Sequence, residues 1–328
     1  QDSIGVTLAQ LRVRNAVDQA KQQWESRQRE IQVLTGKLNP ANDPSFRILR
    51  DQQALQLLAA RTVAQRQLFL AGRALEYEIN QSLSTLGGAV LNANNDLNLS
   101  LLHGCLLGIH QKYRQAFGNP QDYTTNLSVR SMLGIKGARK DEVTGEDLSE
   151  GAQFRQWLLR NENIDGHGGV GVEFSTNLQA NNGLWSSDVC GDRITSVQGQ
   201  IVGDFLGDND ARINLFLAGG GVLADCSSEA VRTWSFGSEK SLAPTGVAMI
   251  QAGVNGFGEA SANTSLFGAP VAGATWKIQI PGGSVEPANL DVNLSKIEDI
   301  VLKIHHKALP KKSTSVTIDT SCLGSVGG

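Results

Sequence analysis

The sequence lacks three features, each of which would assign the protein to a broad functional class. Its formal net charge is −3, so it has no concentrated positive charge for binding nucleic acid. It has no apolar run of about eighteen residues, so no transmembrane helix is expected. Its start, QDSIGVTLAQLRVRN, has no basic and then apolar leader, and it begins without Met, which favours a processed product. Nucleic-acid binding and a membrane span are therefore not expected.

The chain also lacks the short motifs that mark common enzymes. It contains no GxSxG, HExxH or Walker sequence, and no CxxC pair that would indicate zinc or thioredoxin-like chemistry. The segment GHGGVG (166–171) matches GxGxxG in form, but a dinucleotide site needs a helix after it, and strand-like residues follow here. We therefore predict a protein that is not an enzyme and has no cofactor.

The first third of the chain is rich in charged residues and has the apolar spacing of helices. The first helix is expected over about residues 7–38 and the second over about 46–84, separated by a segment with two prolines (39–44). Because the connection is short, the two helices are predicted to form an antiparallel hairpin with coiled-coil spacing. The positions expected at a helix interface are Val17, Ala20, Trp24, Ile31, Leu34, Leu55, Leu58 and Phe69.

The rest of the chain contains most of the 36 glycines and has the alternating pattern of strands. Apolar residues alternate through Trp276, Ile278 and Ile280, which is typical of a strand with one buried face. Short strands with Gly-rich turns predict an antiparallel β-sandwich of jelly-roll type. The fold class is therefore α+β, with helices over 1–120, a mixed connector over 121–167 and the sandwich over 168–328.

The four cysteines could form two disulfides, and we name one pairing for each. Cys190 and Cys226 bracket a predicted strand pair, and Cys105 and Cys322 would join the helical part to the end of the chain. Buried free thiols are the alternative in each case. An even number of cysteines without catalytic spacing favours an oxidising, extracellular location.

Two loops carry residue types that bind ligands. Asp204, Asp208 and Asp210 form an oxygen-rich cluster that suits calcium, although the spacing of an EF-hand is missing and these residues are also common in β-turns. Trp185, with Asn181 and Asn182 nearby, would suit a glycan if the indole is exposed, and simple packing of the ring is the alternative.

Four segments carry a resemblance to a known family: LFLAGRALEYEI (68–79), VEFSTNL (172–178), RITSVQGQIVG (193–203) and the block 265–309. The similar positions in the closing strands are Gly268, Trp276, Pro281, Ile297, Asp299, Val301 and Ile304. These segments resemble the A components of bacterial insecticidal toxin complexes and related large secreted bacterial proteins. The resemblance implies a helical region followed by a sandwich that contacts a partner component. That family's subunits also form pores, but this chain is far shorter and has no obvious apolar membrane-tip hairpin.

These observations favour a secreted structural or interaction protein. We expect it to self-assemble or bind a protein partner by burying the apolar stripes of its helices, and to present the loops of the sandwich. The alternatives are a carbohydrate-binding module and a toxin-complex-like fragment that binds a partner or joins a pore assembly.

Overall fold

The computed structural model describes residues 21–31, 44–141, 144–160, 168–176, 188–207, 210–218, 220–226, 228, 230–235, 246–258, 266–312 and 316–326. The chain divides into two compact units. The helical unit combines Gln1–Ala116 with Thr317–Gly328, and the sheet unit is Phe117–Val316. The sequence-based division differs from this one by assigning the end of the chain to the sheet.

The helical unit is built on one long helix. Residues 21–31 are helical, and α2 (Pro44–Ile79), α3 (Leu86–Asn92) and most of α4 (Asp96–Phe117) follow. Asn80 ends α2 in the left-handed conformation, with φ 53°, which suits the first residue after a helix. A Cβ added at Gly72 would lie 2.6 Å from Leu86, so glycine allows α2 and α3 to pack closely.

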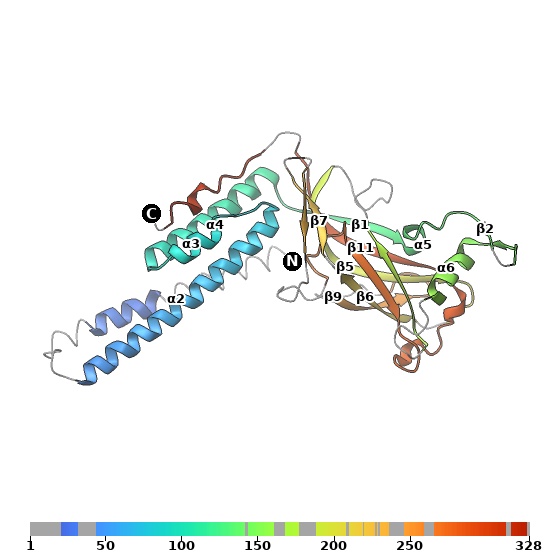
Figure 1. Ribbon diagram of the computed structural model, residues 1–328, viewed down its shortest axis with the longest axis horizontal. Helices are drawn as coiled ribbons and strands as arrows, with labels where there is room; N and C mark the ends of the chain where they lie inside the picture. Colours follow the sequence, from blue (N-terminus) through green and yellow to red (C-terminus); the bar gives the residue numbers. More distant parts are fainter. Residues whose placement is uncertain are drawn as a thin grey trace. The chain divides into compact units, whose positions relative to one another are not determined.

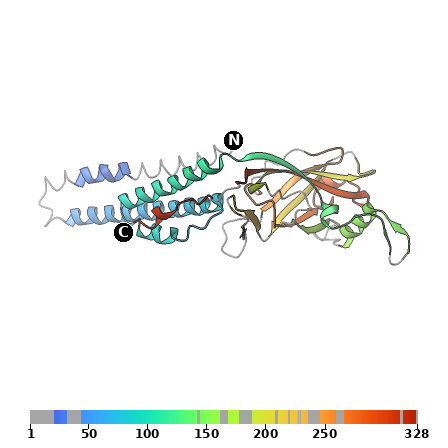
Figure 2. The same ribbon diagram turned by 90° about the horizontal axis from the view of Figure 1, so that it is seen from above.

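The end of the chain returns to these helices. After the sheet unit, residues 316–326 contain the short 3₁₀ helix η4 (Ser321–Leu323). Figures 1 and 2 show this segment beside α4, to which a disulfide joins it. Residues 316–319, which precede η4, are not in a strand.

The sheet unit contains one seven-stranded sheet with the order β1-β11-β5-β9-β6-β10-β4 (Figure 1). All its pairs are antiparallel except β5–β9, which is parallel. Its strands are β1 (Gln121–Ser128), β4 (Val170–Ser175), β5 (Val189–Gly203), β6 (Ala211–Ala218), β9 (Gly246–Gly253), β10 (Thr275–Ile280) and β11 (Ile297–Pro310).

Smaller elements complete the sheet unit. Two two-stranded sheets pair β2 (Arg139–Lys140) with β3 (Asp147–Leu148), and β7 (Gly221–Ala224) with β8 (Val231–Trp234). The helices are α5 (Val129–Met132) and α6 (Glu150–Arg160), with the 3₁₀ helices η2 (Pro287–Asn289) and η3 (Leu294–Lys296). Among the described residues, no helix has both the length and the apolar character to cross a bilayer.

The core of the sheet unit follows the alternation of the strands. Trp276, Ile278 and Ile280 on β10 are each 0% exposed, and the Trp276 ring stacks on Phe174 of the neighbouring β4, with 6.4 Å between ring centroids. The alternating residues of a strand point to opposite faces, so one face of β10 is fully covered. The side chain of Phe154 on α6 is also fully buried in this core.

The fold is mixed helix and sheet, as the sequence indicates at the level of α+β. β1 begins within the region predicted as a mixed connector and pairs with β11 over its whole length. The two-sheet jelly-roll arrangement stays a prediction. The hairpin of the first two predicted helices also stays one, because residues 1–20 and 32–43 lie outside the described part of the chain.

Candidate functional site

Among the described residues of the helical unit, the amino-terminal part of α2 carries a group of exposed apolar side chains. From Arg47 to Ala59 every side chain is exposed except Gln53, and we call this stretch the outer segment. Its five large apolar side chains and their exposed fractions are Ile48 61%, Leu49 39%, Leu55 66%, Leu57 46% and Leu58 48%. Exposed apolar side chains gathered in this way are typical of an interaction surface.

One side of the remaining part of α2 is covered by its own chain. Leu68 and Leu75 are buried, and Gln65 Nε2 donates hydrogen bonds to Val90 O at 3.1 Å and Ala93 O at 3.0 Å. Leu57 lies eleven residues before Leu68, about three helical turns, so both belong to one stripe of the helix. The buried stripe of α2 therefore continues into the outer segment, where its side chains are exposed.

The carboxyl end of α2 is joined to α4 by charged groups. Glu78 Oε1 accepts hydrogen bonds from Arg114 at 2.9 Å and lies 3.2 Å from His110 Nε2. All three side chains are partly buried, where an ion pair is screened less than at an exposed site. This cluster fixes α4 on the covered half of α2.

The predicted helix-interface residues fall into three groups in the structure. Leu55 and Leu58 lie in the outer segment, and Phe69 is 40% exposed further along α2. Ile31 is 38% exposed, and Trp24 is half-buried. Val17, Ala20 and Leu34 lie outside the described residues.

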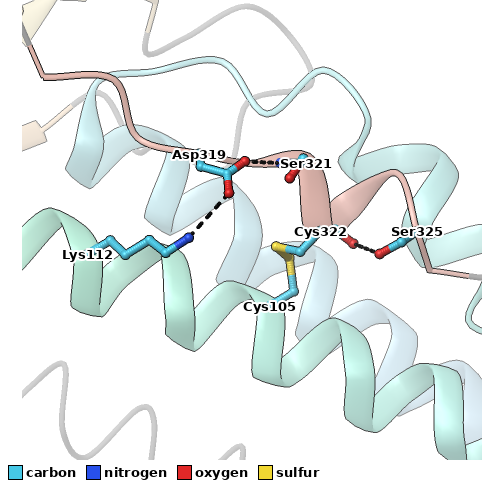
Figure 3. The surroundings of a disulfide bond; sticks show 6 residues. All are labelled: Cys105, Lys112, Asp319, Ser321, Cys322 and Ser325. Atoms are coloured by element: carbon cyan, nitrogen blue, oxygen red, sulfur yellow. Dashed lines mark hydrogen bonds and ion pairs between the residues drawn. A yellow bond between two sulfur atoms is a disulfide. The ribbon is translucent and has the colours of Figure 1, made fainter.

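Each of the two cysteine pairs named from the sequence is joined. Cys190 and Cys226 form a disulfide with an S–S distance of 2.03 Å in the sheet unit, and both residues are buried. Cys105 on α4 and Cys322 on η4 form the other, at 2.02 Å, and both are half-buried (Figure 3). The two bonds thus differ in solvent access.

A charged pair lies beside the Cys105–Cys322 bond. Lys112 Nζ is 3.4 Å from Asp319 Oδ2, and the backbone N–H of Ser321 donates to Asp319 Oδ1 at 2.9 Å (Figure 3). The hydrogen bonds from Ser321, together with Lys112, lower the pKa of Asp319 to about 2. The carboxylate is therefore ionised at neutral pH.

A buried polar chain crosses three strands of the large sheet. His306 Nδ1 on β11 lies 2.5 Å from Asp192 Oδ1 on β5, and His306 Nε2 lies 2.9 Å from Thr125 Oγ1 on β1. His306 is 5% and Asp192 4% exposed, and Tyr123 stacks on the imidazole. The groups satisfy one another between adjacent strands, and we interpret them as a structural connection.

The neighbouring His305 lies on the opposite side of β11 in a partly open environment. Its Nε2 is 2.9 Å from Gln198 Oε1, and its Nδ1 is 3.2 Å from Thr124 Oγ1. A neutral ring with the proton assigned to Nε2 satisfies both contacts. Burial, followed by the charges of Lys303 and His306, lowers the pKa of His305 below its ordinary value.

The candidate ligand-binding residues are only partly described. Asp204 is exposed and Asp210 half-buried, whereas Asp208 lies outside the described residues, so the calcium site stays a prediction. Among the described residues, no three His, Cys, Asp or Glu side chains gather as metal ligands do. Trp185, Asn181 and Asn182 also lie outside the described part, and the glycan site stays a prediction too.

One surface residue escaped the reasoning from sequence. Phe205, between β5 and β6, is 85% exposed and held at φ 58°. It borders a hollow of about 400 Å³ whose other lining residues are Gly203, Leu206, Gly207, Val254 and Asn255. The signal in the sequence is a phenylalanine inside a turn-forming stretch, GDFLGDND (203–210). A left-handed conformation is uncommon for such a bulky residue, which marks this loop as a second exposed apolar feature.

Comparison with known proteins was made at three levels. Neither a protein-family model nor a curated protein matches the chain. The chain is similar to the cryo-EM structure of Morganella morganii TcdA4, with a TM-score of 0.51 and 15% identity, over 88% of this chain and 12% of that one. It is also similar to Yersinia pseudotuberculosis TcaA-TcaB, with a TM-score of 0.47 and 13% identity, over 87% of this chain and 15% of that one. The chain thus spans a small part of each of these proteins, and it shares its fold with a stretch of TcdA4.

Proposed function

We propose that this chain is an extracellular interaction module that assembles through the outer segment of α2 and presents the loops of its sheet unit. The observation that carries the proposal is the exposure of Leu55, Leu57 and Leu58 on a helix that is packed along one side of its remaining part. A helical stretch of this length is marginally stable in water without tertiary packing. Burial of its apolar side chains in a partner would stabilise it by about 25 cal/mol per Å².

The role proposed is binding rather than catalysis, and it needs no cofactor. A second copy of the chain is the first partner to test. The apolar stripe of α2 packs on α3 and α4 in the carboxyl-terminal half of the helix, and the same stripe continues into the outer segment. Two outer segments packed side by side would bury the continued stripe of each copy, in the manner of a coiled coil. The two disulfides suit an oxidising compartment, which supports the extracellular part of the proposal.

A toxin-complex-like role is the second candidate, and the fold shared with part of TcdA4 favours it. In this form, the module would act as one segment of a larger assembly, in which the helices bind neighbouring chains and the sheet unit binds a partner component. A liposome leakage assay distinguishes binding from pore assembly: the binding role predicts assembly without leakage, and leakage by this chain alone would favour the pore.

The assembly proposal is tested by changing the charge of the outer segment. Leu57→Glu with Leu58→Glu places two carboxylates where the interface is proposed, so the variant should be monomeric when the unchanged chain forms oligomers. The control is Gln52→Glu with Gln56→Glu, which adds the same charge at exposed positions on another side of the same helix.

Sedimentation velocity over a range of protein concentrations gives the oligomeric state, and circular dichroism checks that the helices form. The proposal predicts that the control variant assembles as the unchanged chain does. An unchanged chain that stays monomeric at every concentration would refute self-assembly, and a leucine variant that assembles normally would refute the role of the outer segment.

A further inference from the structure

The helical unit is made from both ends of the described chain. α4 leads directly into the sheet unit, and the chain returns at Thr317 to lie on α4 again. The Cys105–Cys322 bond joins residues 217 positions apart, so the whole of the sheet unit lies within the ring that this bond closes. We call residues 316–326, the described part of this return, the terminal segment.

The terminal segment runs along α4 in the opposite direction. Cys322 is bonded to Cys105, while Asp319, three residues earlier, pairs with Lys112, which is two helical turns later on α4 (Figure 3). Leu102 and Ile109 lie one turn on either side of Cys105 and are 0% and 1% exposed. The apolar residues of the terminal segment are also buried: Ile318 6%, Leu323 1% and Val326 3%.

Besides the disulfide, the described terminal segment has an ion pair with α4 and three buried apolar side chains. The Lys112–Asp319 pair has side chains 56% and 61% exposed, and exposed pairs contribute little to stability. η4 has three residues, too few to be stable as an isolated helix. Three apolar side chains therefore provide most of the remaining attachment of a segment that must lose its chain entropy to stay in place.

The two disulfides differ in the access that they offer to a reductant. Cys190 is 1% and Cys226 4% exposed in the sheet unit, whereas Cys105 and Cys322 are both half-buried near the surface. Thiol–disulfide exchange requires a thiolate to reach a sulfur atom, so its rate depends on access. The more accessible bond, Cys105–Cys322, should therefore react first.

We propose that Cys105–Cys322 is a reducible clasp that holds the terminal segment on α4, and that thiol reductants open it while Cys190–Cys226 stays closed. A thiolate of the reductant attacks one sulfur and the other leaves as a thiolate, which takes a proton from water. A second reductant thiol then displaces the first protein sulfur, which is protonated in turn. The products are two protein thiols and one disulfide of the reductant.

The first test uses the unchanged full chain and dithiothreitol as the thiol. Reactions are stopped with a maleimide at increasing times, and the alkylated cysteines are identified by mass spectrometry of peptides. We expect Cys105 and Cys322 to be alkylated at least about tenfold faster than Cys190 and Cys226. Equal rates, or faster reaction at Cys190 and Cys226, would overturn the proposal.

The second test asks whether the terminal segment is released. Backbone hydrogen exchange of residues 316–326 is measured before and after reduction of the clasp, and we expect at least about tenfold faster exchange afterwards, with no change in β10 and β11. Cys105→Ser with Cys322→Ser should show the fast exchange without any reductant. Cys190→Ser with Cys226→Ser is the matched variant, which should still need dithiothreitol. A terminal segment that stays equally protected after its disulfide is cut, in the unchanged chain or in the first variant, would rule out a clasp.

Discussion

The two units of this chain differ in how completely they bury their apolar side chains and their disulfide. In the sheet unit, strands far apart in sequence bury one another, Trp276, Ile278 and Ile280 on β10 have no exposed surface, and the disulfide is buried. In the helical unit, α2 continues beyond the elements that cover it, and the disulfide is half-buried. The comparison teaches that the described strands of the sheet unit bury their apolar face in a core, whereas the described part of the helical unit leaves a group of large apolar side chains on α2 exposed.

The largest expected effect is on the core of the sheet unit. Trp276→Ala removes a fully buried ring that stacks on Phe174, and should lower the free energy of unfolding of the sheet unit by about 3–5 kcal/mol. Leu57→Ala in the outer segment should change the stability of the monomer by less than about 0.5 kcal/mol, because that side chain is 46% exposed. Urea unfolding followed by circular dichroism measures both, and equal losses would contradict the contrast between the units.

The two units can also be compared by the stability that side-chain hydrogen bonds contribute in each. Asn289 is 3% exposed, accepts from Arg212 N at 2.7 Å, and donates to Arg212 O at 2.9 Å and Pro281 O at 2.8 Å. Asn289→Ala removes these three hydrogen bonds, one of them buried and two partly buried, and should cost about 2–3 kcal/mol. In the helical unit, Gln65→Ala loses two bonds at a half-buried position and should cost about 1 kcal/mol. The same unfolding experiment ranks the two, and a larger loss for Gln65→Ala would reverse the comparison.

The sequence predicts much of the local structure because local structure follows from periodicity. The alternation at Trp276, Ile278 and Ile280 correctly identifies a strand with a buried face. Adjacent residues of a strand face opposite sides, and of the neighbours His305 and His306 the second is the buried one. Such patterns require only the geometry of one element.

What the sequence could not provide depends on partners distant in the chain. The pairing of β1 with β11, and the parallel contact between β5 and β9, join segments whose periodicity carries no information about each other. The stripe through Leu55 and Leu58 is visible in the sequence, but periodicity does not say what covers it. Phe205 was missed because its conformation, rather than any pattern, makes it unusual.

A smaller effect is expected from the titration of His305 in the sheet unit. Because its pKa is lowered in the folded protein, the unfolded chain binds the proton more readily once the pH falls below about 6.5. Stability should therefore decrease as the pH falls from 7.5 to 5.5, and His305→Gln should make that decrease shallower. Unfolding midpoints at several pH values measure the difference between the two proteins. Parallel pH profiles would show that His305 does not contribute.

The smallest expected effect concerns Asp319 in the helical unit. Its pKa of about 2 lies below the ordinary value of 3.8, so its stabilising contribution is complete above pH 3.8 and disappears as the pH falls toward 2. Because the pair with Lys112 is exposed, salt should weaken it even at neutral pH.

Asp319→Asn should therefore speed hydrogen exchange in residues 316–326 only slightly at neutral pH while Cys105–Cys322 is closed. The effect should grow once that disulfide is reduced, because the charged pair then provides a larger share of the remaining attachment. Ser325→Ala is a suitable control, since the Ser325 hydroxyl bonds only within the same turn, to Cys322 O at 2.8 Å, and carries no charge. If Asp319→Asn had the same small effect in the oxidised and reduced protein, the charged pair would not help to hold the terminal segment, and the apolar contacts and the disulfide would account for its place on α4.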